Sequence, residues 1–364
     1  MAATTDEFLN DIFTGYLKRF YKEQKPGIDE ELWKHNYNKI ASGVTEGFSA
    51  AFTDPDYLFL HELKQNAGVF SAFKVHDNSA ALVDLLRENK QIRSFSDFKN
   101  AAFPIVGKYN VNWLQSEYSR ALASGRMAAK WKQIERTKHL YPNLKYVAID
   151  DDRTRPEHHA FDNLIYPVEH PFWDSHYPPN GWRCRCTVMQ TDQPVNEGKY
   201  LPSVHKDFRN NVGKTGDIYP DHPYYTTGSN KQIVPEALQL INRTELPGIK
   251  KEALAWAKRM QSLRIHNKEV PGIINITQDG LNHSIQVARN MLPVLFLSQL
   301  PELIALAKFD SKTAGTKAGE MFYKLLIDRE FAGKNYRMVI TIKEYEDAGA
   351  KFKFYDLKIK GEPA

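Results

Sequence analysis

The 364-residue sequence contains only two cysteines, Cys184 and Cys186. Because a secreted chain stabilised by disulfides needs more, we expect a reducing compartment. The sequence also lacks an uninterrupted apolar run of the ~20 residues that span a bilayer. Its first residues, "MAATTDEFLNDIF", are acidic rather than basic, unlike those of a signal peptide. We therefore expect neither export by a signal peptide nor membrane insertion.

Internal repeats, heptads and low-complexity tracts are also missing, while 42% of the residues are hydrophobic, as in a folded protein. The formal net charge of +5 is placed unevenly. Residues 108–140 hold seven Lys or Arg against two Glu, so this segment alone carries 7 − 2 = +5. Such a basic helix indicates either nearby nucleic acid or a solvated helix face, and the solvated face is the commoner cause.

The first part of the chain has the apolar spacing of amphipathic helices. In one stretch Trp33, Tyr37, Ile40, Val44 and Phe48 share one helical face. The same period predicts helices over residues 6–20, 29–48, 57–74, 78–91 and 111–140. Residues 1–104 are thus predicted to be a helical N-terminal region.

The period changes after residue 143. "LKYVAID" alternates like a short strand, and residues 150–181 are Pro-rich, polar and loop-like. "WRCRCTV" then alternates strictly, which predicts a half-buried strand with Trp182, Cys184 and Cys186 on one face and Arg183 and Arg185 on the other.

The last part of the chain has a different pattern. A helical segment over residues 231–260 leads to a strand near 270, one or two helices over 281–307, and two β runs, "NYRMVITIKEY" and "KFKFYDLKIK". The glycine of "EDAGA" between the two runs suits a hairpin loop. We therefore predict an α+β multidomain protein with segments 1–104, 105–230, 231–260 and 261–364.

Several short motifs of the central segment occur in a recognisable order. They are "NWLQSEYSRA" with Trp113, Glu117 and Tyr118, the run from Asp152 to His158, "PFWD" at 171–174, "PPNGWRCRC" at 178–186 and "HPYY" at 222–225. With these motifs the sequence resembles the Mu F-like minor head protein family of tailed phages and prophages, over about residues 105–225. Position 163 is Asn, where a Gly is common in that family.

The resemblance implies a role in head morphogenesis, in which a few copies enter the procapsid near the portal and take part in DNA packaging or ejection. It implies portal and capsid proteins as partners, packaged DNA as a further one, and no membrane. The implied location is the head interior of the virion near the portal, with the host cytoplasm during assembly.

The two cysteines allow three interpretations. Reduced thiols packed against Trp182 suit two buried cysteines and need no cofactor. Alternatively, Cys184, Cys186 and His158 bind a structural zinc ion, although C-x-C is shorter than the usual spacing. His159, His170, His176 or Asp174 would then complete the tetrahedron. A disulfide is disfavoured by strain and by a reducing cytosol. A zinc-dependent hydrolase would need an open coordination position.

The arginines beside these cysteines are candidate binding residues. Arg153, Arg155, Arg183 and Arg185, together with Trp182, lie near several carboxylates in the same stretch. We expect bidentate internal ion pairs with Asp150, Asp151, Asp152 or Glu157, and contact with phosphates is the alternative.

The C-terminal segment resembles the phage-associated nucleases of the barnase, EndoU, colicin and RelE-like superfamily. The resemblance implies helices on a small antiparallel sheet and metal-independent cleavage of RNA. Such chemistry needs a base, an acid and cations. His283 is the candidate base, Tyr355 the acid or phosphate donor, and Lys358, Lys324 or Arg329 the cation. A virion-delivered ribonuclease toxin is therefore the alternative to a purely structural head protein, and an inert interaction domain is the simpler interpretation of this segment.

Overall fold

The structure is a computed structural model that describes residues 5–196, 201–316, 319–345 and 351–361. The chain forms two compact units: one comprises residues 1–49 and 60–240, and the other comprises 50–59 and 241–364. Both units combine helices with sheet, which confirms the predicted α+β class. No helix among the described residues is long and apolar enough to cross a membrane. The four-segment division remains a prediction.

Five long helices, one of them only in part, build the first unit. The side chains that they bury match the apolar spacing of the sequence. In α2, Trp33, Tyr37 and Ile40 are at most 1% exposed. Asp29 caps this helix by accepting a hydrogen bond from the Leu32 N–H group at 3.0 Å. The helices are α1 (Thr5–Glu23), α2 (Glu30–Gly47), α3 (Tyr57–Ala81), α4 (Phe95–Gly107) and α5 (Leu114–Thr137).

The helix predicted over residues 78–91 is wrong. The α3 helix continues to Ala81, and a 3-10 turn (Val83–Leu86) leads into a two-residue hairpin of β1 (Arg87–Glu88) and β2 (Gln91–Ile92). Asn89 and Lys90 form its turn with φ values of 50° and 66°. Two left-handed residues match the twist of a tight hairpin, and asparagine tolerates this conformation better than most residues.

Glycines bring α2 and α5 into backbone contact. A Cβ atom on Gly47 would lie 2.4 Å from the Leu122 carbonyl oxygen, and one on Gly125 would lie 3.0 Å from the Val44 carbonyl oxygen. Only glycine fits at such a close approach of two helices. These positions therefore set the distance between α2 and α5.

A six-residue π-helical segment, η2 (Lys108–Trp113), joins α4 to α5, so the predicted helix begins with a different geometry. Its Asn110 is buried, accepts a hydrogen bond from the Asn36 amide at 2.8 Å and donates one to the Val106 carbonyl at 2.8 Å. Single π turns within helices occur frequently at functional sites. Here the segment ends at Trp113, a residue of the candidate site.

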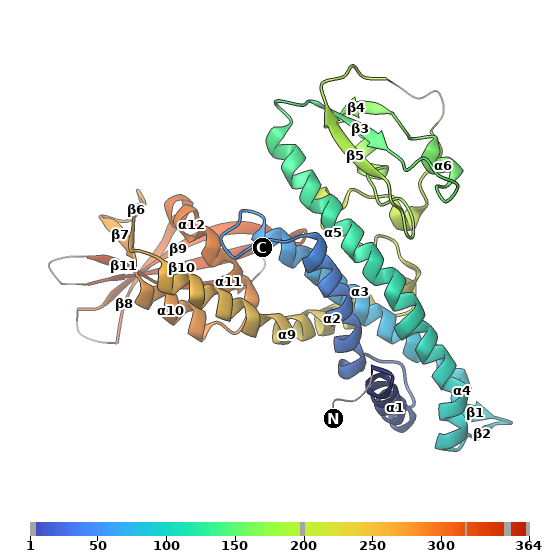
Figure 1. Ribbon diagram of the computed structural model, residues 1–364. Helices are drawn as coiled ribbons and strands as arrows, with labels where there is room; N and C mark the ends of the chain where they lie inside the picture. Colours follow the sequence, from blue (N-terminus) through green and yellow to red (C-terminus); the bar gives the residue numbers. More distant parts are fainter. Residues whose placement is uncertain (1–4, 197–200, 317–318, 346–350, 362–364) are drawn as a thin grey trace. The chain divides into compact units, whose positions relative to one another are not determined.

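A small antiparallel sheet lies beside the C-terminal half of α5 (Figure 1). Its strand order is β4-β3-β5, with β3 (Asn143–Val147) in the centre, β4 (Ile165–Pro167) and β5 (Thr187–Thr191). The Lys130 ammonium group of α5 donates to the Thr187 hydroxyl at 2.8 Å and to the Val188 carbonyl at 3.0 Å. These bonds fix β5 against the helix.

The strand predicted from Trp182 begins only at Thr187. Trp182 and Arg183 lie in a turn that closes where the Cys184 N–H group donates to the Gly181 carbonyl at 3.1 Å, and Arg183 has a φ of 58°. Local turn bonding thus replaces strand pairing up to Cys186. Asn163, where the family commonly has Gly, also adopts a positive φ of 63°.

Apart from β4, the regular elements of residues 148–186 and 201–229 are one-turn helices, in keeping with their Pro-rich, polar sequence. Tyr219 stacks on Phe70 of α3 at 3.8 Å between ring centroids, which fixes the second stretch on the helices. The short elements are α6 (Pro156–His159), α7 (Phe172–Ser175), η3 (Lys206–Phe208), α8 (Val212–Thr215) and η4 (Pro223–Thr226).

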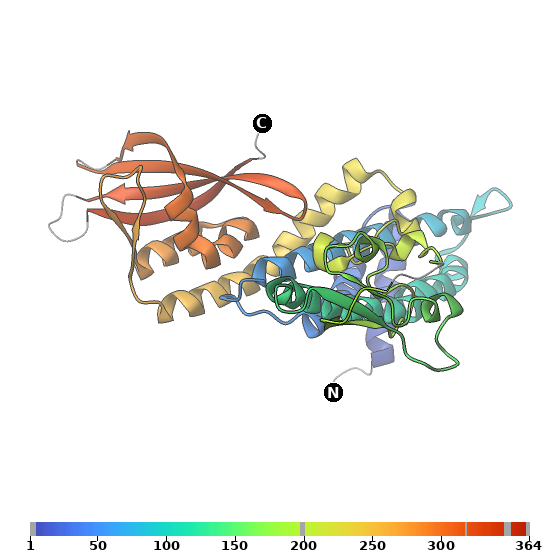
Figure 2. The ribbon, with the colours of Figure 1, turned by 90° about the horizontal axis from the view of Figure 1, so that it is seen from above.

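The second unit is a six-stranded sheet with helices on one face (Figure 2). The order is β6-β7-β11-β10-β9-β8, antiparallel except for the β7–β11 pair. The strands are β6 (Leu263–His266), β7 (Ile273–Ile276), β8 (Lys308–Ala314), β9 (Met321–Phe331), β10 (Lys334–Glu344) and β11 (Phe352–Gly361); the helices are α9 (Asn230–Arg259, shared with the first unit), α10 (Gln278–Val287), α11 (Met291–Phe296) and α12 (Leu300–Leu306).

The strands of this sheet have one apolar and one polar face. Leu325, Ile340 and Leu357 are paired neighbours and nearly inaccessible on the helix-covered face. Lys324, Thr341 and Asp356 form the adjacent row, which the pleat turns to the other side. The two predicted β runs correspond to β10 and β11, whereas the predicted "EDAGA" loop lies outside the described residues.

Candidate functional site

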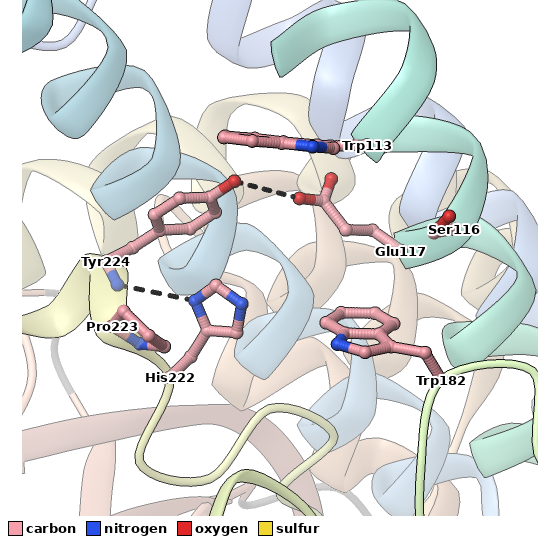
Figure 3. Close-up of a pocket in the computed structure, with 7 residues that line it drawn as sticks. All are labelled: Trp113, Ser116, Glu117, Trp182, His222, Pro223 and Tyr224. Carbon is pink, nitrogen blue, oxygen red and sulfur yellow. Dashed lines mark hydrogen bonds between the residues drawn. The ribbon is translucent and has the colours of Figure 1, made fainter. Parts of the chain in front are cut away.

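Three motif segments of the first unit meet at one pocket of about 420 Å³. Figure 3 shows Trp113 and Trp182 on opposite sides of the Glu117 side chain, with His222 and Tyr224 across from it. Trp113 ends η2, Glu117 lies in the first turn of α5, and Trp182 belongs to the turn before β5. His222 and Tyr224 flank Pro223 at the start of η4. The fold therefore unites motifs that are about 100 residues apart.

A buried ion pair fixes the carboxylate of this pocket. Glu117 is bonded to the Lys74 ammonium group of α3, and the side chains are 3% and 0% exposed. The Tyr224 hydroxyl donates to the same carboxylate at 3.3 Å, and the Tyr219 hydroxyl donates to the Glu117 carbonyl at 2.6 Å. Burial raises the pKa of Glu117 and lowers the pKa of Lys74, while their mutual contact opposes both shifts.

His222 is a neutral hydrogen-bonding group in the pocket. Its Nδ1 atom accepts a hydrogen bond from the Tyr224 backbone N–H at 3.3 Å, as Figure 3 shows. Burial, together with the charges of Arg120 and Lys74, lowers the pKa of His222 to about 4. The imidazole therefore carries no charge at neutral pH.

Arg120 lies behind the pocket among aromatic rings. It is 5% exposed, donates to the Ile218 carbonyl at 2.7 Å and to the Asp207 carbonyl at 2.9 Å, and places its guanidinium 4.1 Å from the centroid of Phe208 and 5.5 Å from that of Trp182. Burial lowers the pKa of Arg120 to about 10. Arg120 of the basic segment thus makes internal contacts, as Lys130 does, and DNA contact by the other cations of the segment stays a prediction.

The groups that line the pocket are suited to binding. It offers two indole rings and a neutral imidazole, and its carboxylate is already engaged by Lys74. A nucleophile with an adjacent free base, which covalent catalysis requires, is not formed by its lining residues.

The predicted metal-ligating residues lie together. The Nδ1 atom of His158 in α6 is 3.8 Å from the Cys184 sulfur and 3.5 Å from the Cys186 sulfur, and the three donor atoms lie within 4.8 Å of one another. His158 is 3% and Cys186 7% exposed, and neither cysteine forms a disulfide. A hydrogen bond between the sulfurs lowers the pKa of Cys184 to about 7 and raises the pKa of Cys186 above its usual range.

The four residues considered as a further ligand are placed elsewhere. Asp174 pairs with Lys214 at 2.6 Å, the His176 ring contacts Ser175 and the Pro202 carbonyl, and the His170 Nδ1 atom accepts from the Phe172 N–H group. His159 is exposed. Among the described residues, three donors that could hold a metal ion therefore lie together at this position.

The neighbouring arginines make internal contacts. Arg185 binds the Asp151 carboxylate with both terminal nitrogens, at 2.5 and 2.8 Å, and Arg153 pairs with the same carboxylate at 3.3 Å. Arg155 donates to the Trp182 carbonyl at 2.8 Å. The pair with Arg185 lowers the pKa of Asp151 well below its usual range. These contacts agree with the expected ion pairing for two arginines, and phosphate binding by them or by Arg183 remains untested.

In the second unit the structure brings two of the predicted catalytic residues together. The rings of His283 in α10 and Tyr355 in β11 have centroids 4.4 Å apart. The cations are dispersed: Lys358 pairs with Asp356 at 2.7 Å and Arg329 with Glu302 at 3.0 Å. Lys324 lies in the polar row of the sheet beside Thr341.

Sequence reasoning missed the polar partners of the pocket. Lys74 looks like any exposed lysine in a helical pattern, and Arg120 looks like part of a basic helix face. A lysine between Phe73 and Val75 in an otherwise apolar stretch was the available signal for burial, since an isolated charge there needs a partner.

Comparison with known proteins finds a phage family that is similar to part of the chain. Residues 107–189 match the family described as "Phage Mu protein F like protein", so this part of the chain, with Trp113, Glu117 and Trp182, is Mu F-like. Residues 244–355 match "Large polyvalent protein-associated domain 3", nearly coincident with the main segment of the second unit.

Two curated relatives share the Mu F-like part. Over 61 residues the chain is 49% identical to protein F of Escherichia phage Mu, whose name describes capsid assembly; the alignment covers 17% of this chain and 14% of that protein. Over 80 residues it is 43% identical to the Mu-like prophage FluMu F protein of Haemophilus influenzae, covering 22% and 19%. The matches thus span less than a fifth of either relative. No solved structure matches the chain.

Proposed function

We propose that this chain is a minor head protein of a tailed phage or prophage that acts in procapsid assembly and in DNA packaging or ejection near the portal. The observation that carries the proposal is the 49% identity with the phage Mu protein over 61 residues, together with the match of residues 107–189 to the Mu F-like family. Its partners would be portal and capsid proteins, with packaged DNA as a further contact, and its location would be the virion head.

The geometry of the first unit supports an assembly role. Its motif residues are engaged by other groups of the unit: Glu117 by Lys74 and Arg120 by backbone carbonyls in the interior, and Arg185 by Asp151 at the surface. Such contacts fix the shape of a module. A rigid binding module is what a protein built into a capsid requires.

A gene deletion in the phage or prophage that encodes the chain tests the role. The deleted phage is complemented with the wild-type gene, with Trp182→Ala or with His283→Ala, and DNA-filled heads are counted by electron microscopy. We expect few filled heads without the gene, a partial defect for Trp182→Ala, and wild-type numbers for His283→Ala. Normal numbers of filled heads without the gene would refute the role.

Cross-linking tests the location. Purified procapsids are treated with a lysine-reactive cross-linker, and the peptides joined to this chain are identified by mass spectrometry. We expect links to portal subunits at a few copies of the chain per head. Links to major capsid subunits alone, distributed over many copies, would contradict a position near the portal.

The second unit supports a second candidate function, a metal-independent ribonuclease carried by the virion. The supporting observation is the 4.4 Å separation of the His283 and Tyr355 rings, which places a base and a hydroxyl donor side by side. Lys343, which interacts electrostatically with Tyr355, is a further candidate cation and pairs with Glu320.

RNA cleavage by the full-length chain in the presence of a chelator tests this activity. We expect His283→Ala to slow cleavage by about 10²–10⁴-fold, as loss of a general base does. His266→Ala changes an exposed histidine of β6 in the same unit and is the matched control. Intact RNA after incubation with the wild-type chain, or equal rates for the two variants, would rule the ribonuclease out.

A further inference from the structure

We infer that His158, Cys184 and Cys186 form a zinc site in the first unit. The inference starts from the direction of the three side chains. Both sulfurs approach the same nitrogen, Nδ1 of His158, at 3.8 and 3.5 Å. A hydrogen bond would need only one of them, because a ring nitrogen carries one proton or one lone pair. Convergence of three donors on a common centre is the arrangement of a metal site.

The distances fit tetrahedral zinc. Zn–S bonds of about 2.3 Å and Zn–N bonds of about 2.0–2.1 Å at tetrahedral angles place sulfur and nitrogen about 3.6 Å apart. The two observed S···N separations bracket this value. Nitrogen and sulfur donors select zinc over magnesium or calcium, which take oxygen ligands. The three donors leave one tetrahedral position, which we assign to water.

The surroundings favour ligation as well. His158 and Cys186 are more than nine-tenths buried, so these donors are already withdrawn from solvent. Asn180, four residues before Cys184, is buried as well. Asn180 also accepts from the Tyr146 hydroxyl at 2.8 Å, which ties the turn to β3. Such outer contacts orient metal ligands and are typical of built sites.

The ion would fasten two distant loops. His158 follows β3, and the cysteines immediately precede β5, so one zinc ion would close the 25 residues between His158 and Cys184. Arg155, three residues before His158, holds the Trp182 carbonyl at 2.8 Å. Zinc would thereby hold Trp182, which lines both the aromatic pocket and a second cavity of about 560 Å³ beside His158.

Metal content of the full-length chain, purified without a polyhistidine tag, tests the site. We expect one zinc ion per chain after dialysis. After replacement by Co²⁺, we expect the visible bands of tetrahedral cobalt and the ultraviolet charge-transfer band of thiolate ligands. Chelation should lower the thermal midpoint by about 10 °C, if zinc is present at about a thousand times its dissociation constant.

Variants connect the metal to these residues. Cys184→Ser changes the half-exposed cysteine and His158→Gln the imidazole, and both should reduce zinc to background and remove or alter the cobalt bands. His159→Gln changes the adjacent exposed histidine and should retain one zinc ion. If a variant does not fold, the cobalt spectrum of the wild-type chain still decides.

Two results would overturn the inference. A folded wild-type chain that takes up neither zinc nor cobalt would show that the cysteines are reduced packing thiols. Zinc content that is unchanged in folded Cys184→Ser and His158→Gln chains would place the metal elsewhere in the protein.

Discussion

The two compact units bury different kinds of side chain. The first unit encloses the Lys74–Glu117 pair, Arg120 and a cluster of asparagines that includes Asn36 and Asn110. In the second unit, the described residues that are both buried and polar are Asn267, Ser284 and Asp356, and its core is formed by aliphatic and aromatic side chains between sheet and helices.

The two kinds of buried side chain contribute differently to the stability of a unit and to the precision of its geometry. An apolar core gains free energy from burial with little dependence on orientation, whereas a buried ion pair gains little net free energy and demands defined geometry. The first unit has such a buried ion pair at the pocket where the Mu F-like motifs meet. We therefore expect single polar changes to be severe there, and changes of size to be severe in the second unit.

Removing one partner of the buried ion pair should have the largest effect. Glu117→Leu leaves Lys74 uncompensated and should lower the free energy of unfolding of the first unit by about 3–5 kcal/mol. Urea denaturation followed by tryptophan fluorescence measures it, since five of the six tryptophans lie in this unit. The double variant Lys74→Met with Glu117→Leu should recover most of the loss; equal losses for single and double variants would contradict the account.

A core truncation should be the counterpart in the second unit. Leu325→Ala removes an inaccessible side chain that pairs with Ile340 and should cost about 2–5 kcal/mol. Amide hydrogen exchange of β9 to β11 reports on this unit alone. Exchange that accelerates equally in α2 and α5 would mean that the two units unfold as one.

The glycine contact between α2 and α5 should be sensitive to a single methyl group. Gly47→Ala places a Cβ atom 2.4 Å from the Leu122 carbonyl and 2.9 Å from the Arg126 nitrogen, so the helices must move apart at a cost of about 1–3 kcal/mol. Gly27→Ala, where a Cβ atom meets nothing within 4 Å, is the matched control. Thermal denaturation compares the two variants.

Acid should weaken the first unit through His222. Its pKa falls from 6.5 to about 4 on folding, so between these pH values the unfolded chain binds a proton that the folded chain does not. The free energy of unfolding therefore decreases as pH drops from 6.5 to 4. His222→Gln should show a shallower decrease over that window in urea titrations at several pH values. Parallel curves would show that His222 does not contribute.

The smallest effect is expected at the exposed Asp151–Arg185 pair. Asp151→Asn removes a solvent-accessible ion pair and should leave the free energy of unfolding nearly unchanged. A loss as large as that of Glu117→Leu would mean that burial is not what distinguishes the two pairs.

Long regular elements were predictable from the sequence because their pattern repeats over several turns or pleats. The stripe through Trp33, Tyr37 and Ile40 predicts α2, and the alternation in "NYRMVITIKEY" predicts β10. Short elements were not, since "WRCRC" alternates equally well in a strand and in an extended turn. The strands β6, β8 and β9 also escaped prediction. In the edge strands β6 and β8, exposed residues on both faces leave no alternation to detect.

The candidate sites were predictable to different degrees. His158, Cys184 and Cys186 could be grouped because few residue types bind metal and these lie within 30 residues of one another. The pairing of Lys74 with Glu117 depends on how α3 packs against α5, which no local pattern encodes. Site residues of rare types could therefore be predicted from the sequence. Site residues whose partners depend on the packing of helices could not.

The π turn at Lys108–Trp113 determines the rotation of α5, the helix that follows it, about the helix axis. One residue of an α-helix corresponds to about 100° of rotation and 1.5 Å of rise. Deleting a single residue from this turn would therefore rotate Glu117 away from Lys74 and move Gly125 off the backbone of α2 in one step. A change in the length of the π turn would therefore shift every side chain of α5. We expect the number of residues in this turn to vary less than their identities.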